Sequence, residues 1–295
     1  MPVLRPVLPR RQLLRGLALL GGGAALAGCS DLAFTLANLP ARSGRFTRRA
    51  DLAYGQDPRQ QLDVYAPTAA RDAPVIVFWY GGAWTRGNRA DYSFVGAALA
   101  DAGFVTVLAD YRLYPQVKFP QFLQDGAAAV QWVGAHAADY GGDPRRLFLA
   151  GHSAGAHLAA MLAVQPRWLE RAGADPRAIR GLIGLSGPYA LAPNSAVLNA
   201  IFAAPFVPAD WQPAGLVTAQ APPALLLHGG DDEVVWPVQA EQMAAALRAA
   251  GVAVDLEIYA GRGHADTVAA LSWAGRAPVL AAIQRFVSAR SGPSR

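Results

Sequence analysis

A serine set between glycines carries the strongest chemical signal in this sequence. The pentapeptide G-H-S-A-G at residues 151–155 places Ser153 in the pattern G-x-S-x-G. A serine hydroxyl is a poor nucleophile unless a neighbouring base takes its proton. Among the histidines, His264 fits that role, because it lies in the glycine-rich stretch 261–265 and shows no pattern of core packing. Attack of Ser153 on an acyl carbonyl is therefore the chemistry that these residues could perform.

An orienting carboxylate is the third requirement, since it fixes the imidazole and stabilises its protonated form. Three adjacent acids, Asp231, Asp232 and Glu233, follow the apolar run 224–228. Each is a candidate by type and position, although an acidic run is also typical of a solvated loop. Among the other histidines, we expect His157 and His228 to be packing or structural residues.

The elements around these residues alternate in the way of a parallel sheet. Short apolar runs predict strands at 62–65, 75–80, 105–110, 147–150, 182–185, 224–228 and 254–259. Ala-rich stretches predict helices at 93–102, 122–138, 154–164, 238–250 and 278–289. This alternation favours a mostly parallel sheet with helices on both faces. Ser153 would then lie at a strand–turn–helix junction, at the carboxyl ends of the strands where ligands bind.

Composition excludes several other classes of protein. The chain has 295 residues, 53% of them hydrophobic and 16% charged, so it can bury a folded core. Its formal charge of +5 comes mostly from residues 1–28, because the remainder holds 22 basic and 21 acidic residues. A nucleic-acid-binding protein needs a basic face on its folded part, so we expect no nucleic-acid partner. The basic cluster at 42–49 is interpreted as a solvated linker.

These motifs resemble those of the α/β-hydrolase superfamily. The chain order Ser153, Asp232, His264 is the order in which that superfamily presents its catalytic residues. The stretch H-G-G-D-D-E-V-V at 228–235 is similar to its acid loop, H-G-x-x-D-x-x-V, and that offset selects Asp232, with Asp231 as runner-up. The resemblance implies an α/β-hydrolase fold, with a mostly parallel central sheet, helices on both faces and a small cap segment.

A second motif concerns the oxyanion that forms during acyl transfer. The sequence Y-G-G-A-W at 80–84 resembles the H-G-G-x-W motif of the esterase and formamidase branch, with Tyr80 in place of histidine. By that resemblance, the backbone N–H groups of Gly82, Ala83 and Ala154 would bind the oxyanion. One such donor contributes about 10²–10³-fold in rate. The substitution at Tyr80 leaves open how this loop is held.

Further sequence motifs extend the resemblance, and a later segment suggests where a substrate would bind. The stretch D-Y-R-L at 110–113, followed by F-P at 119–120 and Asp125, is similar to hormone-sensitive-lipase-like esterases. We interpret Asp110 and Arg112 as forming a buried or half-buried ion pair that fixes loops. The Pro-containing segment 187–223 is predicted to be the cap. Four aromatic residues could wall a pocket beneath it, or could only cover the sheet: Trp84, Phe202, Phe206 and Trp211.

The N-terminal segment resembles a bacterial export and lipoprotein signal. The sequence R-R-Q-L-L-R at 10–15 is similar to the twin-arginine motif, and the apolar stretch 16–28 is too short to span a bilayer. L-A-G-C at 26–29 is similar to a lipobox, in which the cysteine is lipidated, and Cys29 is the only cysteine of the chain. We expect a signal at 1–28, a tether at 29–50 and a hydrolase domain at 51–295.

The sequence therefore predicts a serine carboxylesterase that hydrolyses small carboxylic esters through an acyl-enzyme. An arylformamidase-type amidase and a non-catalytic binding lipoprotein of the same fold are the alternatives. The sequence contains neither a zinc-binding nor a nucleotide-binding motif, so no cofactor and no metal are expected. The expected partners are a small-molecule ester and, through lipidated Cys29, the membrane of the bacterial cell envelope on its periplasmic side.

Overall fold

Eight strands pair into one sheet in the computed structural model, which describes residue 38 and residues 45–272 and 278–290. Their order is β1-β2-β4-β3-β5-β6-β7-β8. The strands are β1 (Phe46–Ala53), β2 (Gln61–Pro67), β3 (Ala73–Trp79), β4 (Val105–Ala109), β5 (Gly142–His152), β6 (Ile179–Leu185), β7 (Ala224–Gly229) and β8 (Val254–Tyr259). Strands β3 to β8 are parallel, and β2 is antiparallel to both β1 and β4. The predicted mostly parallel sheet is confirmed.

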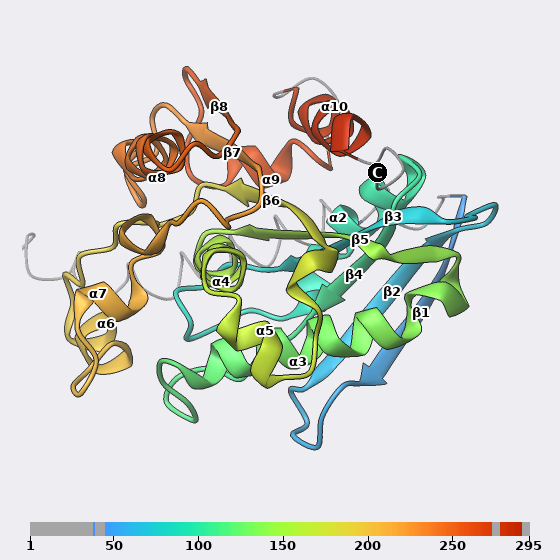
Figure 1. The fold of residues 1–295 in the computed structure, drawn as a ribbon, viewed down its shortest axis with the longest axis horizontal. Coiled ribbons are helices and arrows are strands. Elements are labelled where there is room, and N and C mark those ends of the chain that lie inside the picture. The colour runs from blue at the N-terminus through green and yellow to red at the C-terminus, as the bar shows by residue number, and fades with distance from the viewer. Residues whose placement is uncertain (1–37, 39–44, 273–277, 291–295) are drawn as a thin grey trace, which may run out of the picture.

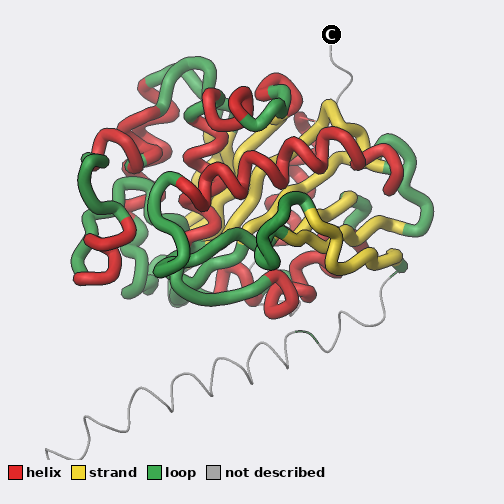
Figure 2. The backbone as a smooth tube through the Cα atoms, turned by 90° about the horizontal axis from the view of Figure 1, so that it is seen from below, coloured by secondary structure: helices red, strands yellow, loops and turns green. Residues whose placement is uncertain are grey.

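Helices cover both faces of this sheet (Figures 1 and 2). They are α2 (Ser93–Asp101), α3 (Gln121–His136), α4 (Ala154–Val164), α5 (Arg167–Arg171), α6 (Ala196–Ile201), α7 (Pro208–Trp211), α8 (Val238–Ala249), α9 (Asp266–Ala269) and α10 (Val279–Arg290). In the part of the chain that the structure describes, no helix combines the length and apolar character needed to cross a bilayer.

The register of the strands shows which helices share a face. Tyr65 and Phe148 lie in one row of paired residues across β2, β4, β3 and β5, so their side chains point to the same side. Gly96 of α2 lies directly against the ring of Tyr65, and Phe286 of α10 packs on Phe148 with ring centroids 6.2 Å apart. Helices α2 and α10 therefore cover one face, while α3 and α4 pack together in front of the other (Figure 1).

Helix α4 forms the centre of the molecule. Its sequence, A-G-A-H-L-A-A-M-L-A-V, is apolar around almost its whole circumference, and all of its residues are buried. A helix that is apolar on every side is stable only inside a core. Strand β5 leads into it through Ser153, so the start of α4 is fixed by packing on all sides.

Strand β1 was missed by the sequence analysis. Its sequence, F-T-R-R-A-D-L-A, is mostly exposed and lacks the apolar alternation of a half-buried strand. It begins at Phe46, inside the segment 29–50 that was expected to be a tether. The interpretation of residues 42–49 as a linker was wrong for residues 46–49, which are mostly exposed but belong to β1. Nη2 of Arg48 lies 2.7 Å from the buried carboxylate of Asp63 on β2. The predicted export signal and lipobox, with Cys29, lie outside the described residues.

The segment between β6 and β7 folds as the sequence predicted for a cap. It contains α6, α7 and the short 3₁₀ helix η5 (Pro213–Leu216). Helices α6 and α7 lie at the left-hand end of the molecule in Figure 1, away from β1 and β2. Strands β3, β5, β6 and β7 end in loops on the side of the sheet that this segment adjoins.

Gly155 permits the close approach of α4 to β3, which suggests a stability test. A Cβ atom at Gly155 would overlap the backbone carbonyl of Trp79, and backbone cannot yield as a side chain can. We expect Gly155→Ala to lower the free energy of unfolding by at least about 2 kcal/mol, as overpacking does. Gly134 is the matched control, because it lies exposed in α3 where a Cβ meets nothing within 4 Å.

Gly134→Ala should instead raise the free energy of unfolding by about 0.5–1 kcal/mol, because alanine is the better helix former. Urea unfolding of the two variants beside the wild type measures both effects. Equal stability of Gly155→Ala and wild type would contradict the packing described for α4.

Candidate active site

The backbone at Ser153 adopts a strained turn between β5 and α4. Its φ is 54° and its ψ is −121°, a region of backbone conformation that residues other than glycine rarely occupy. The amide of Ser153 donates to the carbonyl of Leu185 at 2.9 Å, which ties the turn to the end of β6. A Cβ at Gly151 would overlap the backbone of Gly155, so the small flanking residues are a requirement of the turn. The hydroxyl of Ser153 is thereby presented at the end of the sheet, before the N-terminus of α4.

The three residues selected from the sequence meet in one line. Nε2 of His264 lies 2.9 Å from Oγ of Ser153, and Nδ1 of His264 lies 2.8 Å from Oδ2 of Asp232. Asp232 comes from the loop after β7, and His264 from the loop after β8. The spacing is that of a nucleophile, a base and a carboxylate that orients the base. Asp231 and Glu233, the other two acids, are exposed, and Asp232 is the acid that lies on Nδ1 of His264.

Asp232 is a buried carboxylate with several hydrogen-bond donors. Its Oδ1 accepts from the backbone amides of Val234 and Val235 at 2.9 and 2.8 Å. Nε2 of His228 lies 3.2 Å from its Oδ2, although that nitrogen donates most directly to the carbonyl of Val235, at 2.7 Å. Burial alone would raise the pKa of Asp232, but the hydrogen bonds from His228, His264 and Val235 outweigh it and hold the pKa well below the usual range.

Three backbone amides remain available near the serine. Gly82 and Ala83 follow β3 and have φ values of 133° and 51°, which turn their peptide groups out of the strand direction. Within residues 45–272 and 278–290, the N–H groups of Gly82, Ala83 and Ala154 have no hydrogen-bond acceptor. A Cβ at Gly81 would lie 2.9 Å from Cβ of Ser153, so this loop runs directly beside the serine. The arrangement suits an anion held between the loop and the start of α4.

Tyr80 holds this loop in place of the histidine of the family motif. Its ring stacks on that of Tyr111 with centroids 4.9 Å apart, and the hydroxyl of Tyr111 donates to the carbonyl of Tyr80 at 3.0 Å. Arg59 donates to the hydroxyl of Tyr80 at 2.6 Å and to the carbonyl of Gly87 at 2.8 Å. Burial raises the pKa of Tyr80 well above its usual value, so the hydroxyl stays neutral. The loop is thus fixed from behind by a buried tyrosine pair.

Three of the four aromatic residues predicted to wall a pocket pack together, and the fourth, Phe206, joins them through Phe119. Phe202 contacts Trp84 and Trp211, with ring centroids 5.0 and 4.9 Å apart. These three side chains are buried, whereas Phe206 is partly exposed and packs on Phe119 at 4.9 Å. The cap is therefore anchored on the tryptophan of the glycine loop, which couples the two segments beside Ser153.

Two histidines that the sequence analysis did not select also belong to this region. His157 is buried in α4, and its Nε2 donates to the carbonyl of Trp211 in the cap at 2.7 Å. His152, beside the serine, contacts Tyr92 and the backbone of His264. His152 fills the variable position of the pentapeptide, and Tyr92 lies 60 residues earlier in the chain. No sequence motif connects the two.

Asp110 and Arg112 each form ion pairs, but with partners other than each other. Arg112 donates hydrogen bonds from both its guanidinium and its backbone amide to the carboxylate of Asp125 on α3, with distances of 2.7–3.1 Å. Asp110 accepts from the backbone amide of Arg89 at 2.8 Å and pairs with the guanidinium of the same residue. The expected role of fixing loops fits both pairs, and neither reaches Ser153.

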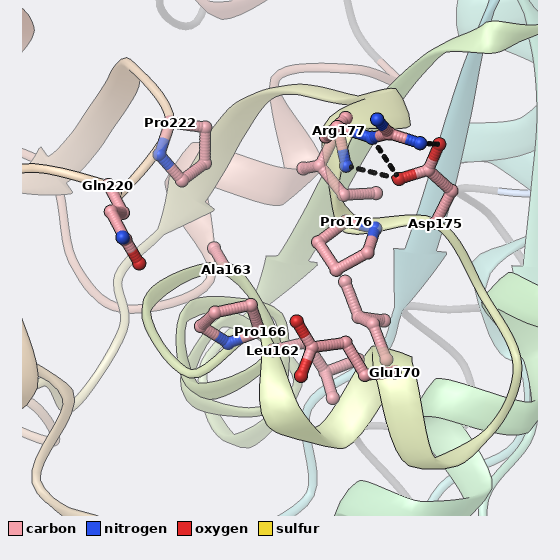
Figure 3. Close-up of a pocket in the computed structure, with 11 residues that line it drawn as sticks. Leu162, Ala163, Pro166, Glu170, Asp175, Pro176, Arg177, Gln220 and Pro222 are labelled. Atoms are coloured by element: carbon pink, nitrogen blue, oxygen red, sulfur yellow. Dashed lines mark hydrogen bonds and ion pairs between the residues drawn. The ribbon is translucent and has the colours of Figure 1, made fainter.

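A hollow of about 660 Å³ lies at the far end of α4 from Ser153 (Figure 3). It is lined by the last turn of α4 and by α5, with residues 175–177, Ile179, Gln220 and Pro222. The ion pair of Asp175 with Arg177 stands at its edge. Nothing in it resembles a catalytic cluster. Among the described residues, no group of three His, Cys, Asp or Glu side chains is placed to hold a metal ion.

Comparisons with known proteins agree with the fold. A family model described as BD-FAE matches residues 62–180, and the prolyl oligopeptidase family model matches residues 208–290. The chain resembles esterase B from Lactobacillus rhamnosis, with a TM-score of 0.77 and 19% identity over 93% of this chain and 97% of that one. It also resembles Thermogutta terrifontis esterase 2, with a TM-score of 0.65 and 26% identity over 83% and 92% of the two chains.

The chain is also similar in sequence to curated proteins that are named esterases. The isoprenylcysteine alpha-carbonyl methylesterase of Arabidopsis thaliana is 31% identical over 74% of this chain and 56% of that protein. The esterase LipC of Mycobacterium tuberculosis is 33% identical over 70% of this chain and 57% of that protein. The chain thus spans little more than half the length of these relatives.

The sheet order and the strained serine turn between β5 and α4 define an α/β-hydrolase fold. Within this fold, the matches above make the chain similar to the carboxylesterase branch of the α/β-hydrolase superfamily.

The low pKa of Asp232 makes a prediction about stability at acid pH. Because folding lowers this pKa, ionised Asp232 stabilises the fold; the contribution is complete above its ordinary pKa of 3.8 and is lost as pH falls toward the lowered value. Asp232→Asn removes this contribution. The free energy of unfolding of the variant should therefore fall less steeply than that of the wild type between about pH 5 and pH 3.

Asp231→Asn is the matched control, because Asp231 is the adjacent, exposed acid. Its unfolding free energy should follow the wild-type slope in urea titrations at each pH. A wild-type slope in Asp232→Asn as well would show that Asp232 is not held ionised by its neighbours.

Proposed function

We propose that this chain hydrolyses carboxylic esters through an acyl-enzyme formed on Ser153. The observation that carries the proposal is the line of contacts from Oγ of Ser153 through the ring of His264 to Asp232, at 2.9 and 2.8 Å. In this account Asp232 keeps the proton of His264 on Nδ1, which leaves Nε2 free to accept the serine proton. The low pKa of Asp232 favours that arrangement, because the carboxylate remains ionised when the imidazole becomes charged.

The reaction proceeds in two balanced halves. Oγ of Ser153 attacks the acyl carbonyl while its proton passes to Nε2 of His264, and the oxygen of the tetrahedral intermediate accepts from the amides of Gly82, Ala83 and Ala154. The C–O bond to the alcohol then breaks, and His264 returns the proton to the leaving alcohol. Water repeats the sequence on the acyl-enzyme: His264 takes a proton from water, the acid is released and Ser153 is reprotonated.

The proposed substrates are esters of small or moderately apolar acids. The named relatives, a methylesterase and several esterases, support ester chemistry. The aromatic cluster of Trp84, Phe202 and Trp211 is buried beside the glycine loop, and Phe206 remains partly exposed at its edge. We assign Phe206 and the neighbouring cap surface as the apolar wall that contacts the acyl or alcohol group, with Trp84, Phe202 and Trp211 supporting that wall.

Turnover of p-nitrophenyl esters from acetate to decanoate tests the activity. The wild type should release p-nitrophenol, with a maximum among the shorter acyl chains because the aromatic cluster limits the space. Ser153→Ala should lower kcat by at least about 10³-fold, because it removes the nucleophile and leaves only the binding groups. Thermal unfolding should show that the variant keeps the fold.

Three results would change the assignment. Turnover by Ser153→Ala at the wild-type rate would eliminate Ser153 as the nucleophile. Turnover of N-formyl aryl amides in preference to the matched esters would move the chain to amide hydrolysis. A folded wild type that hydrolyses neither class would leave a binding protein of hydrolase fold.

We further propose that the protein is lipidated on Cys29 and anchored to the bacterial cell envelope. The proposal rests on the twin-arginine-like and lipobox-like motifs of residues 10–15 and 26–29. Expressed in a bacterium fed an alkyne fatty acid, the full chain should acquire the label and sediment with membranes. Cys29→Ala should lose the label; a label that persists in this variant would exclude Cys29 as its site.

A further inference from the structure

His152 lies at the point where three segments of the site meet. It is the last residue of β5 and directly precedes Ser153. Its Nδ1 lies 3.1 Å from the hydroxyl of Tyr92, and its Nε2 lies 3.1 Å from the backbone carbonyl of His264. The side chain is buried between the glycine loop and the loop that carries His264. The mechanism proposed above assigns it no role.

The partners of His152 determine which of its nitrogens carries the proton. A backbone carbonyl can only accept, so Nε2 must be the protonated nitrogen that donates to His264. Burial, followed by the proximity of His264, lowers the pKa of His152 to about 3, and the ring is therefore neutral near pH 7. Nδ1 then bears a lone pair and accepts from the hydroxyl of Tyr92.

The same chain of hydrogen bonds reaches the glycine loop. The oxygen of Tyr92 accepts from the amide of Gly81 at 3.4 Å, a long hydrogen bond. A Cβ at Gly81 would lie 3.0 Å from Nδ1 of His152, so the loop rests directly on the imidazole. The order is thus the Gly81 amide to Tyr92, Tyr92 to His152, and His152 to the carbonyl of His264. These contacts connect the loop beside the oxyanion position to the loop of the base.

We propose that His152 is a positioning residue that fixes the His264 loop and the glycine loop relative to Ser153. The inference rests on the proposed function, because it concerns the geometry of acyl transfer at Ser153. A displacement of about 1 Å at a reacting group can cost about 10²-fold in rate. His152 can make both hydrogen bonds only as the neutral imidazole. A second proton, on Nδ1, would break the contact with Tyr92 and place a positive charge beside the imidazolium of His264.

Two substitutions separate the two ends of the imidazole. His152→Gln can still place an N–H group near the position of Nε2 and donate to the carbonyl of His264. His152→Asn is too short to reach that carbonyl but keeps an acceptor near Tyr92. With p-nitrophenyl acetate, we expect His152→Asn to lower kcat at least about tenfold with KM nearly unchanged, and His152→Gln to recover kcat to within about threefold of the wild type.

Thr267→Val is the matched control for a general loss of stability. Oγ1 of Thr267 and Oγ of Ser186 form a buried hydrogen bond of 3.0 Å between α9 and the end of β6, close to the His264 loop but outside the proposed machinery. This variant should lose melting temperature to a similar extent as His152→Asn, yet keep kcat within about threefold of the wild type. If His152→Asn does not fold, Tyr92→Phe takes its place, with an expected fall in kcat of at least about threefold.

The outcomes distinguish this inference from the proposed function. Loss of kcat in His152→Asn, recovery in His152→Gln and retention in Thr267→Val would support positioning. Wild-type kcat in a folded His152→Asn, or in Tyr92→Phe where that variant replaces it, would overturn it. Equal losses in His152→Asn, His152→Gln and Thr267→Val would also overturn it, in favour of simple destabilisation. A wild type that neither turns over esters nor reacts with a fluorophosphonate would overturn the proposed function itself.

Discussion

The turn at Ser153 is the constraint on which the rest of the site depends. A residue with a side chain is held at φ 54° and ψ −121°, a conformation that costs about 1–3 kcal/mol and persists only where its surroundings fix it. Here the surroundings are the fully buried helix α4, the close backbone contact of Gly155 with β3, and the hydrogen bond to the end of β6. Without that rigid junction, the hydroxyl would not stand at a fixed distance from loops that arrive from other strands.

Loops after four parallel strands supply the remaining groups. The glycine loop follows β3, the cap follows β6, Asp232 follows β7 and His264 follows β8. A buried side chain makes a hydrogen bond in each case: the Tyr80–Tyr111 pair for the glycine loop, His157 for the cap, Asp232 for its own loop and His152 for the loop of His264. Two buried histidines, His152 and His157, are held neutral by burial and serve as donors to backbone carbonyls, which leaves His264 as the imidazole in contact with the serine.

Local patterns made much of this arrangement predictable. The seven expected strands and five expected helices are present because each buried strand reads as an apolar run and α4 as an Ala-rich stretch. Ser153, Asp232 and His264 could be chosen because short motifs impose their backbone geometry. Strand β1 escaped detection because an exposed edge strand has no apolar alternation. The contact between Tyr92 and His152 joins residues 60 positions apart, and only tertiary packing brings them together.

Mass mapping of a covalent fluorophosphonate adduct tests the central claim most directly. If Ser153 is the nucleophile activated by His264, the reagent should add once per chain, on the peptide that contains Ser153, and His264→Ala should slow the addition at least about 10³-fold. An adduct on another residue, or a folded wild type that remains unlabelled, would contradict the account of this site as a serine hydrolase centre.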